Sequence, residues 1–206
     1  MLTEESSKQK QSLLQLLISD DLAELNAKSK DEFNIFKVLK LQNNEVKHSN
    51  FLGWLLTPFE SHKLMDNFLK EFFKIALRND TSLVDIILKD LTDAKITLEK
   101  MINNGQRMDI FIDCPTNKLV CVIENKVWAG EHDNQLENYR NYVLNHEKYK
   151  DYEYKIFLFL TPYEYSNCDD YKGYIRINYG DILKAISNTP QTKLFLNGDE
   201  PLLCSL

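Results

Sequence analysis

The sequence predicts a mixed α/β protein in which helices pack on a β-sheet. Up to about residue 90 the apolar residues recur at helical spacing, which indicates a helical first half. From residue 95 they gather in short runs rich in β-branched and aromatic residues, with one amphipathic segment between the third and fourth runs. This order is typical of one mixed sheet with helices on it, so we expect a single domain over residues 1–206.

The helical part is expected over residues 1–90. Its spacing is clearest in two segments, 33–39 and 51–56, and the second of these stops before Pro58. Proline cannot donate the backbone hydrogen bond that a helix interior needs. We therefore expect a helix that ends just before Pro58.

The sheet and its helices are expected over residues 95–188. A long polar segment at 131–149 carries Leu136, Tyr139 and Val143 at 3-4 spacing, which predicts an amphipathic helix. Another helix is expected near 181–186, and the pattern after Asn188 is weak. The predicted strands lie at residues 96–98, 108–112, 119–123, 155–160 and 174–177.

Composition narrows the class of protein further. With 206 residues, of which 43% are hydrophobic, the chain can bury a sizeable core. The net charge of -6 argues against a protein that coats nucleic acid or an anionic membrane without specificity, although a local basic cleft remains compatible with it. Any contact with nucleic acid is therefore expected to be focused.

The cysteines and the N-terminal segment bear on the compartment. The four cysteines form no CxxC pair and show no zinc-ligand spacing with the histidines, so we expect reduced thiols. The leucine-rich patch at 13–18 is too short for a signal core or a membrane span. We expect a cytoplasmic protein with no membrane partner.

The stretch VCVIENKVW, residues 120–128, places charged residues directly after a run typical of a buried strand. Charged side chains are costly to desolvate unless they are paired, hydrogen-bonded or bound to a metal. Alternate residues of a strand share a face, so Glu124 and Lys126 are expected to point the same way. A lone E-x-K pattern is more often a surface salt bridge, and only further residues give it a catalytic meaning.

The preceding predicted strand supplies a second carboxylate, Asp109. Strand alternation places Asp109 on the face opposite Met108, Ile110 and Ile112, and a turn at Asn117 would bring it towards Glu124. Two neighbouring carboxylates repel unless a cation lies between them, and oxygen ligands of this kind suit Mg²⁺ or Mn²⁺. These residues predict metal-assisted phosphodiester hydrolysis, with a lysine that orients or deprotonates the attacking water. The alternative for Asp109 is a plain ion pair with a neighbouring basic residue.

Together these residues resemble a known family. Asp109, fifteen positions before Glu124-Asn125-Lys126, is similar to the D…(D/E)-x-K signature of the PD-(D/E)XK nuclease superfamily. Gln135 and Tyr139 resemble the Q-x-x-x-Y motif of one large bacterial and phage-type branch. The E-x-x-H-S segment that starts at Glu45 resembles the helical start of that branch, and the likeness extends over residues 33–186. The departure is Arg107-Met108, which stands where the family name has proline.

The resemblance implies a restriction-endonuclease-like α/β/α core with a mixed β-sheet, preceded by an N-terminal helical region. It further implies that Asp109 and Glu124 are metal ligands, with the backbone carbonyl of Asn125 as a third and Lys126 beside the attacking water. It assigns Glu45 an added metal-ligand role, although a first-turn acidic residue of a helix explains Glu45 equally simply.

Other residues are open to a structural reading. Gln135 and Tyr139 either support packing or contact the substrate or the catalytic residues. His48, His62 and His132 are expected to be capping or solvated residues. The aromatic residues Trp128, Tyr149, Tyr152 and Tyr154 could stack on bases, but core or rim packing is the more common role.

We therefore expect a nuclease that depends on Mg²⁺ or Mn²⁺, with DNA favoured over RNA by the resemblance alone. The acidic charge favours an effector of a bacterial defence or restriction system that is silent until a protein partner delivers nucleic acid. A homo-oligomer is the other assembly that we expect. The alternative is a catalytically silent nucleic-acid-binding or assembly module of the same fold.

Overall fold

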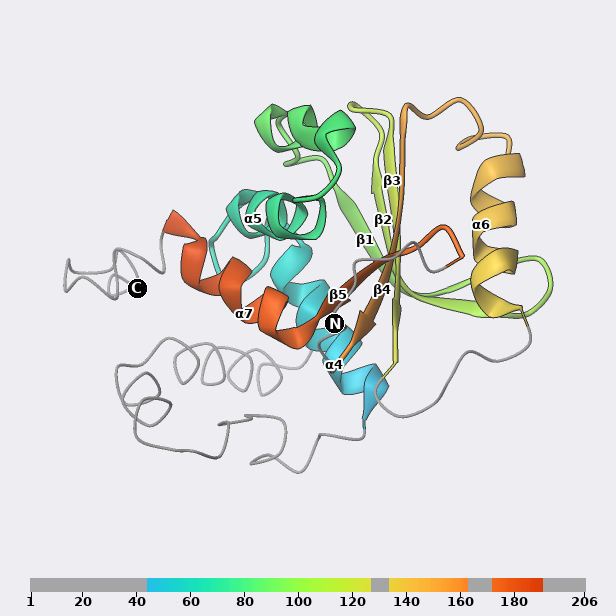
Figure 1. Cartoon of the computed structure of the whole chain (residues 1–206), viewed down its shortest axis with the longest axis horizontal. Coiled ribbons are helices and arrows are strands. Elements are labelled where there is room, and N and C mark those ends of the chain that lie inside the picture. Colours follow the sequence, from blue (N-terminus) through green and yellow to red (C-terminus); the bar gives the residue numbers. More distant parts are fainter. Residues whose placement is uncertain (1–43, 127–133, 163–171, 191–206) are drawn as a thin grey trace.

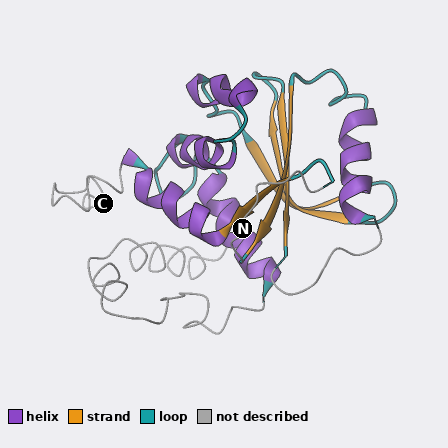
Figure 2. Cartoon of the chain, in the orientation of Figure 1, coloured by secondary structure: helices purple, strands orange, loops and turns teal. Residues whose placement is uncertain are grey.

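The computed structural model describes residues 44–126, 134–162 and 172–190. Within them a five-stranded sheet lies between two helical layers (Figure 1). One face is covered by α4 (Glu45–Leu56), α5 (Asn67–Ala76), the 3₁₀ helix η1 (Thr81–Leu88) and α7 (Tyr179–Asn188), and the other by α6 (Gln135–Asn145) (Figure 2). This arrangement confirms the predicted α/β class. No helix in the described ranges is both long and apolar enough to cross a membrane.

The strands follow one another in the sheet in chain order. The first three form an antiparallel meander, and the last two run parallel to the third, so α6 lies on the crossover between β3 and β4. All five predicted strands are present with shifted ends. They are β1 (Lys95–Met101), β2 (Arg107–Cys114), β3 (Leu119–Asn125), β4 (Tyr154–Thr161) and β5 (Ile175–Asn178).

Helix α4 brings its first turn to the carboxyl end of β3. Asn44 caps the helix, with its side chain accepting from the Lys47 backbone N–H at 3.1 Å, and the helix ends before Pro58 as predicted. Gly53 permits a close approach to the sheet, since a Cβ atom there would lie 2.7 Å from Cδ2 of Leu98 in β1. The predicted helix at 33–39 lies outside the described residues.

The sheet separates two buried clusters, and β3 contributes to both. Leu119, Cys121 and Ile123 pack on the side of α4, α5 and α7. Val120 and Val122 pack on the α6 side, where the predicted apolar stripe of α6 is fully buried. If this alternation continues, Glu124 belongs to the α6 side and Asn125 to the α4 side. Cys114 and Cys121 are buried free thiols, whereas Cys168 and Cys204 lie outside the described residues.

The alternation of β2 breaks at Asp109. Met108 packs in the α6-side cluster and Ile110 in the opposite one, although two residues apart in a strand they should share a face. The expectation that they lie on one face is therefore wrong at Met108. The break coincides with an irregularity in β1, where Glu99 has a left-handed backbone with φ of 50° between the pairs that β1 makes on either side of Asp109.

This backbone conformation predicts that position 99 prefers glycine to alanine, the reverse of the usual order in a strand. Glycine in a strand is usually less stable than alanine by about 0.5–1 kcal/mol, but a side chain in the left-handed region costs about 1–2 kcal/mol. We expect Glu99→Gly to have a higher free energy of unfolding than Glu99→Ala by about 1 kcal/mol in urea denaturation. Both variants lose the carboxylate, so charge does not enter the comparison.

The matched control is Thr97, an exposed residue of β1 that is not among the positive-φ residues. There Thr97→Ala should be more stable than Thr97→Gly. The same order at both positions would contradict the strain assigned to Glu99.

Candidate active site

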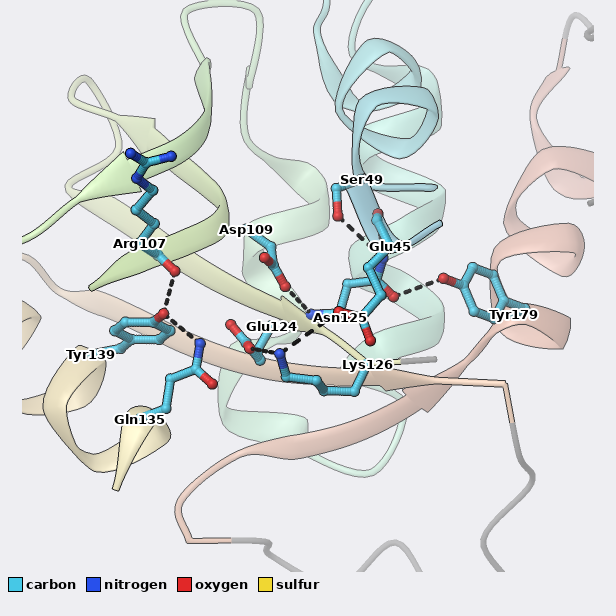
Figure 3. A network of polar contacts seen from close by, with 10 residues as sticks. All are labelled: Glu45, Ser49, Arg107, Asp109, Glu124, Asn125, Lys126, Gln135, Tyr139 and Tyr179. Atoms are coloured by element: carbon cyan, nitrogen blue, oxygen red, sulfur yellow. Dashed lines mark hydrogen bonds and ion pairs between the residues drawn. The ribbon is translucent and has the colours of Figure 1, made fainter. Parts of the chain in front are cut away.

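Two carboxylates lie on adjacent strands at the end of the sheet. Ile110 pairs with Ile123 across β2 and β3, and the next step of this register brings Asp109 towards Glu124. Asp109 Oδ2 accepts a hydrogen bond of 2.7 Å from the backbone N–H of Asn125 (Figure 3). The antiparallel pairing predicted from the turn at Asn117 is thus present.

The Glu124 carboxylate is fully buried, with 0% of the residue exposed. Its Oε1 lies 3.0 Å from Nζ of Lys126, whereas its Oε2 has no hydrogen-bond partner among the described residues. The same ammonium lies 3.9 Å from Oε2 of Glu45, in the first turn of α4 (Figure 3). Lys126 therefore stands between two carboxylates from different elements.

Burial and mutual repulsion dominate the electrostatics of this cluster. Burial, together with the charge of Asp109, raises the pKa of Glu124 to about 8 against the pull of Lys126. Burial likewise raises the pKa of Asp109 to about 6, although the Asn125 N–H and Lys126 act in the opposite direction. Burial lowers the pKa of Lys126, but the carboxylates led by Glu124 outweigh it, so the pKa is raised and Lys126 is an ammonium at neutral pH.

The donor atoms fit a hard divalent cation. Glu124 Oε2 is buried without a hydrogen-bond partner in the described ranges, and a cation would favour the ionised form of both carboxylates. No group of three or more His, Cys, Asp and Glu side chains in these ranges is arranged to hold a metal. A cation at this point would thus depend on Asp109 and Glu124 together with a backbone oxygen.

Gln135 and Tyr139 on α6 reach the start of β2. Gln135 Nε2 donates to Tyr139 Oη at 2.6 Å, and Tyr139 Oη donates to the backbone carbonyl of Arg107, two residues before Asp109. Burial raises the pKa of the Tyr139 hydroxyl, which is therefore a neutral donor. In this structure the pair holds the strand that carries Asp109, and contact with substrate stays a prediction.

The structure adds residues that the sequence reasoning missed. His48, expected to be a capping or solvated residue, is buried and lies 2.8 Å from Tyr179 Oη through its Nδ1. Ser49 and Tyr179 both bond the side chain of Asn125. The E-x-x-H-S spacing carried a signal, because residues three and four positions after Glu45 lie on the same helical face. No pattern in the sequence indicated the role of Tyr179.

Further expectations concerned aromatic and histidine residues. His62 is buried, with Nε2 2.9 Å from the carbonyl of Trp54 and Nδ1 accepting from the backbone N–H of Leu64 at 2.9 Å. Of the two expected roles, capping or solvated, the solvated one is therefore wrong there. Tyr149 and Tyr154 are buried, as expected for packing residues, and Tyr152 is half-buried and donates to Asp113. Trp128 and His132 lie outside the described residues.

A mixed sheet with helices on both faces, carboxylates on two adjacent strands and a lysine at the end of the central strand is consistent with a restriction-endonuclease-like α/β fold. The family model of the PD-(D/E)XK nuclease superfamily matches residues 33–195, and the chain belongs to this superfamily. No curated protein and no solved structure matches the chain. Members of the superfamily generally hydrolyse phosphodiester bonds, so membership indicates a nuclease.

The raised pKa of Glu124 predicts how stability depends on pH without metal. Below its ordinary value of 4.5, Glu124 is protonated in both the folded and unfolded states. Between 4.5 and about 8 only the folded state keeps the proton, so this contribution to stability is lost as pH rises through that window. In a chelator, the free energy of unfolding of the wild type should fall more steeply between about pH 5 and about pH 8 than that of Glu124→Gln, by at most about 1.4 kcal/mol per pH unit.

Urea denaturation at several pH values measures both slopes. Every other titrating group is present in both proteins, so the difference between the slopes reports Glu124 together with the neighbouring Asp109, whose charge acts on it. Parallel curves would show that the Glu124 carboxylate ionises normally in the folded protein.

Proposed function

We propose that this protein is a nuclease that uses Mg²⁺ or Mn²⁺ to hydrolyse phosphodiester bonds. Asp109 and Glu124, with the backbone carbonyl of Asn125, would hold the cation. Glu45 faces Lys126 at 3.9 Å in this structure, and its role as an added ligand from α4 stays a prediction of the resemblance. The observation that carries the proposal is the buried Glu124 carboxylate, whose Oε2 has no hydrogen-bond partner among the described residues. A structural ion pair would satisfy its acceptors, whereas a ligand keeps one available.

A bound cation would supply charge stabilisation at the phosphoryl group and would make water easier to deprotonate. The residues around it have separate tasks. Lys126, an ammonium at neutral pH and held 3.0 Å from Glu124, donates hydrogen bonds that orient the attacking water and offset developing negative charge. Tyr139 and Gln135 keep β2, and with it Asp109, in place.

The substrate and setting extend the proposal. We favour DNA over RNA on the family resemblance, because the site residues themselves do not discriminate the two. The net charge of -6 disfavours unassisted binding to a polyanion, so we propose a cytoplasmic effector of bacterial defence or restriction that receives nucleic acid from a protein partner or through its own oligomer.

The alternative is a catalytically silent nucleic-acid-binding or assembly module. It is favoured by one observation, the position of the Lys126 ammonium between Glu124 and Glu45, which compensates buried negative charge without a cation. Metal binding and turnover distinguish the two functions.

Divalent cations are expected to raise the melting temperature. A ligand that binds only the folded state stabilises it by mass action, by about 2.7 kcal/mol at one hundred times its Kd. Thermal unfolding in Mg²⁺ or Mn²⁺ should therefore shift upwards relative to chelator, and Asp109→Asn should lose most of that shift.

The matched control is Asp113→Asn. Asp113 is a buried aspartate of the same strand that pairs with Lys148 rather than with the site. It should keep the metal-dependent shift whatever its own stability. Equal shifts in both variants, or no shift in the wild type, would refute a cation site at Asp109.

Removal of Lys126 tests the chemical step. Lys126→Ala should bind Mn²⁺ at least as tightly as the wild type, because the site loses a competing positive charge. It should cut nucleic acid about 10²- to 10⁴-fold more slowly, since the attacking water loses its orienting group. Cleavage of linear, circular and single-stranded DNA and of RNA measures this, alongside calorimetric metal binding.

Lys70→Ala is the control, since Lys70 of α5 makes a 2.8 Å ion pair with the buried Asp66, at the N-cap position of that helix. It should cleave like the wild type per folded molecule. Equal activity in Lys126→Ala would remove the lysine from the mechanism, and a wild type that binds metal but cuts no substrate would favour the silent module.

A further inference from the structure

A histidine and a tyrosine from helices far apart in the sequence meet behind the candidate site. His48 lies on α4, one turn after Glu45, and Tyr179 is the first residue of α7. Nδ1 of His48 is 2.8 Å from Tyr179 Oη, and the two rings meet nearly at right angles with centroids 5.3 Å apart. His48 is buried and Tyr179 half-buried.

Both residues act on one amide, the side chain of Asn125 at the end of β3. Tyr179 Oη donates to Asn125 Oδ1 at 2.7 Å. Asn125 Nδ2 donates to the backbone carbonyl of Glu45 at 3.2 Å and to Ser49 Oγ at 3.1 Å. A single fully buried amide thereby ties α4 and α7 to β3 (Figure 3).

The donor and the acceptor of each hydrogen bond in the series His48–Tyr179–Asn125 follow from one backbone group, the carbonyl of Glu45. The carbonyl of Glu45 can only accept, so the amide atom facing it must be Nδ2, and Oδ1 must face Tyr179. An oxygen facing the hydroxyl requires Tyr179 to donate its only proton to Asn125. His48 must then donate to Tyr179, so its Nδ1 carries a proton.

This series of hydrogen bonds is linked to the candidate site through the backbone of Asn125. Its N–H donates to Asp109 Oδ2, and its neighbours on either side are Glu124 and Lys126. We propose that His48, as the Nδ1-protonated tautomer, and Tyr179 are positioning residues that orient Asn125 and so hold Asp109 and Glu124 in the arrangement that binds a divalent cation. The proposal rests on the proposed function, because it concerns the same site.

A packing role and a positioning role require different side-chain properties at position 48. A packing residue needs volume and apolar surface, whereas the chain of hydrogen bonds needs a donor at the Nδ1 position. Leucine and asparagine have the same number of side-chain heavy atoms, and Nδ2 of asparagine occupies the place on Cγ that Nδ1 has in histidine. His48→Leu and His48→Asn thus separate volume from donor.

The experiment measures Mn²⁺ affinity by calorimetry, per folded molecule, for His48→Leu, His48→Asn and Tyr179→Phe. Loss of a residue that orients metal ligands typically weakens binding about 10- to 100-fold, which we expect for His48→Leu and Tyr179→Phe. His48→Asn should recover most of the affinity. Tyr154→Phe is the control, since it removes a partly buried hydroxyl that bonds Asp85 at the other end of the sheet, and it should leave Mn²⁺ affinity unchanged.

A spectroscopic measurement tests the tautomer without metal or substrate. The ¹⁵N resonances of His48 in the metal-free protein should report a proton on Nδ1, and a proton on Nε2 alone would overturn the proposal. Equal Mn²⁺ affinities for His48→Leu and His48→Asn would overturn it as well.

A wild type that cuts nucleic acid while these variants bind Mn²⁺ normally would refute the positioning role and leave the nuclease function intact. The expected order of affinities in a wild type that cuts nothing would refute the nuclease function alone.

Discussion

The burial of the Glu124 carboxylate is the constraint on which the rest of the site depends. A carboxylate withdrawn from water costs several kcal/mol unless neighbours compensate it. Because β3 is central and covered on both faces, compensation must come from groups in direct contact. Lys126 supplies one positive charge and Asp109 a second carboxylate that competes for it, so Glu124 keeps its proton to a higher pH than a carboxyl group in water does. The raised pKa of Glu124 therefore follows from where the chain places this one side chain.

The end of β3 also connects the two helical layers. Glu124 lies towards α6, whose Tyr139 braces β2, while the next residue, Asn125, turns its side chain to α4 and α7. Alternation along one strand thus assigns adjacent residues to opposite layers and lets each layer hold a different part of the same site. The break in the inward–outward alternation of β2 lies at Asp109, between Met108 on the α6 side and Ile110 on the α4 side. It therefore falls at the position where β2 and β3 bring their carboxylates together.

Local patterns predicted the strands and α6, because β-branched runs and helical spacing are properties of short segments. The proximity of Asp109 and Glu124 also followed, since it needed only alternation and one turn. The face of Met108 could not be predicted, because a glutamate in a sequence gives no indication of a left-handed backbone such as that of Glu99 in the adjacent strand. The burial of His48 depends on Tyr179, 131 residues later, and such a contact leaves no periodic signal in either segment. The matched range confirms the superfamily, and the roles of its residues remain predictions.

The hydrogen bond from Tyr179 to Asn125 has a consequence for synthesis of the chain. Ribosomes deliver a protein from its N-terminus, and the acidic residues of the site emerge long before α7. A growing chain can pair β2 with β3, yet its Asn125 amide lacks the hydroxyl that orients it until the last helix in the described ranges has been made. The order of synthesis therefore delays this hydrogen bond to Asn125 until α7 has left the ribosome.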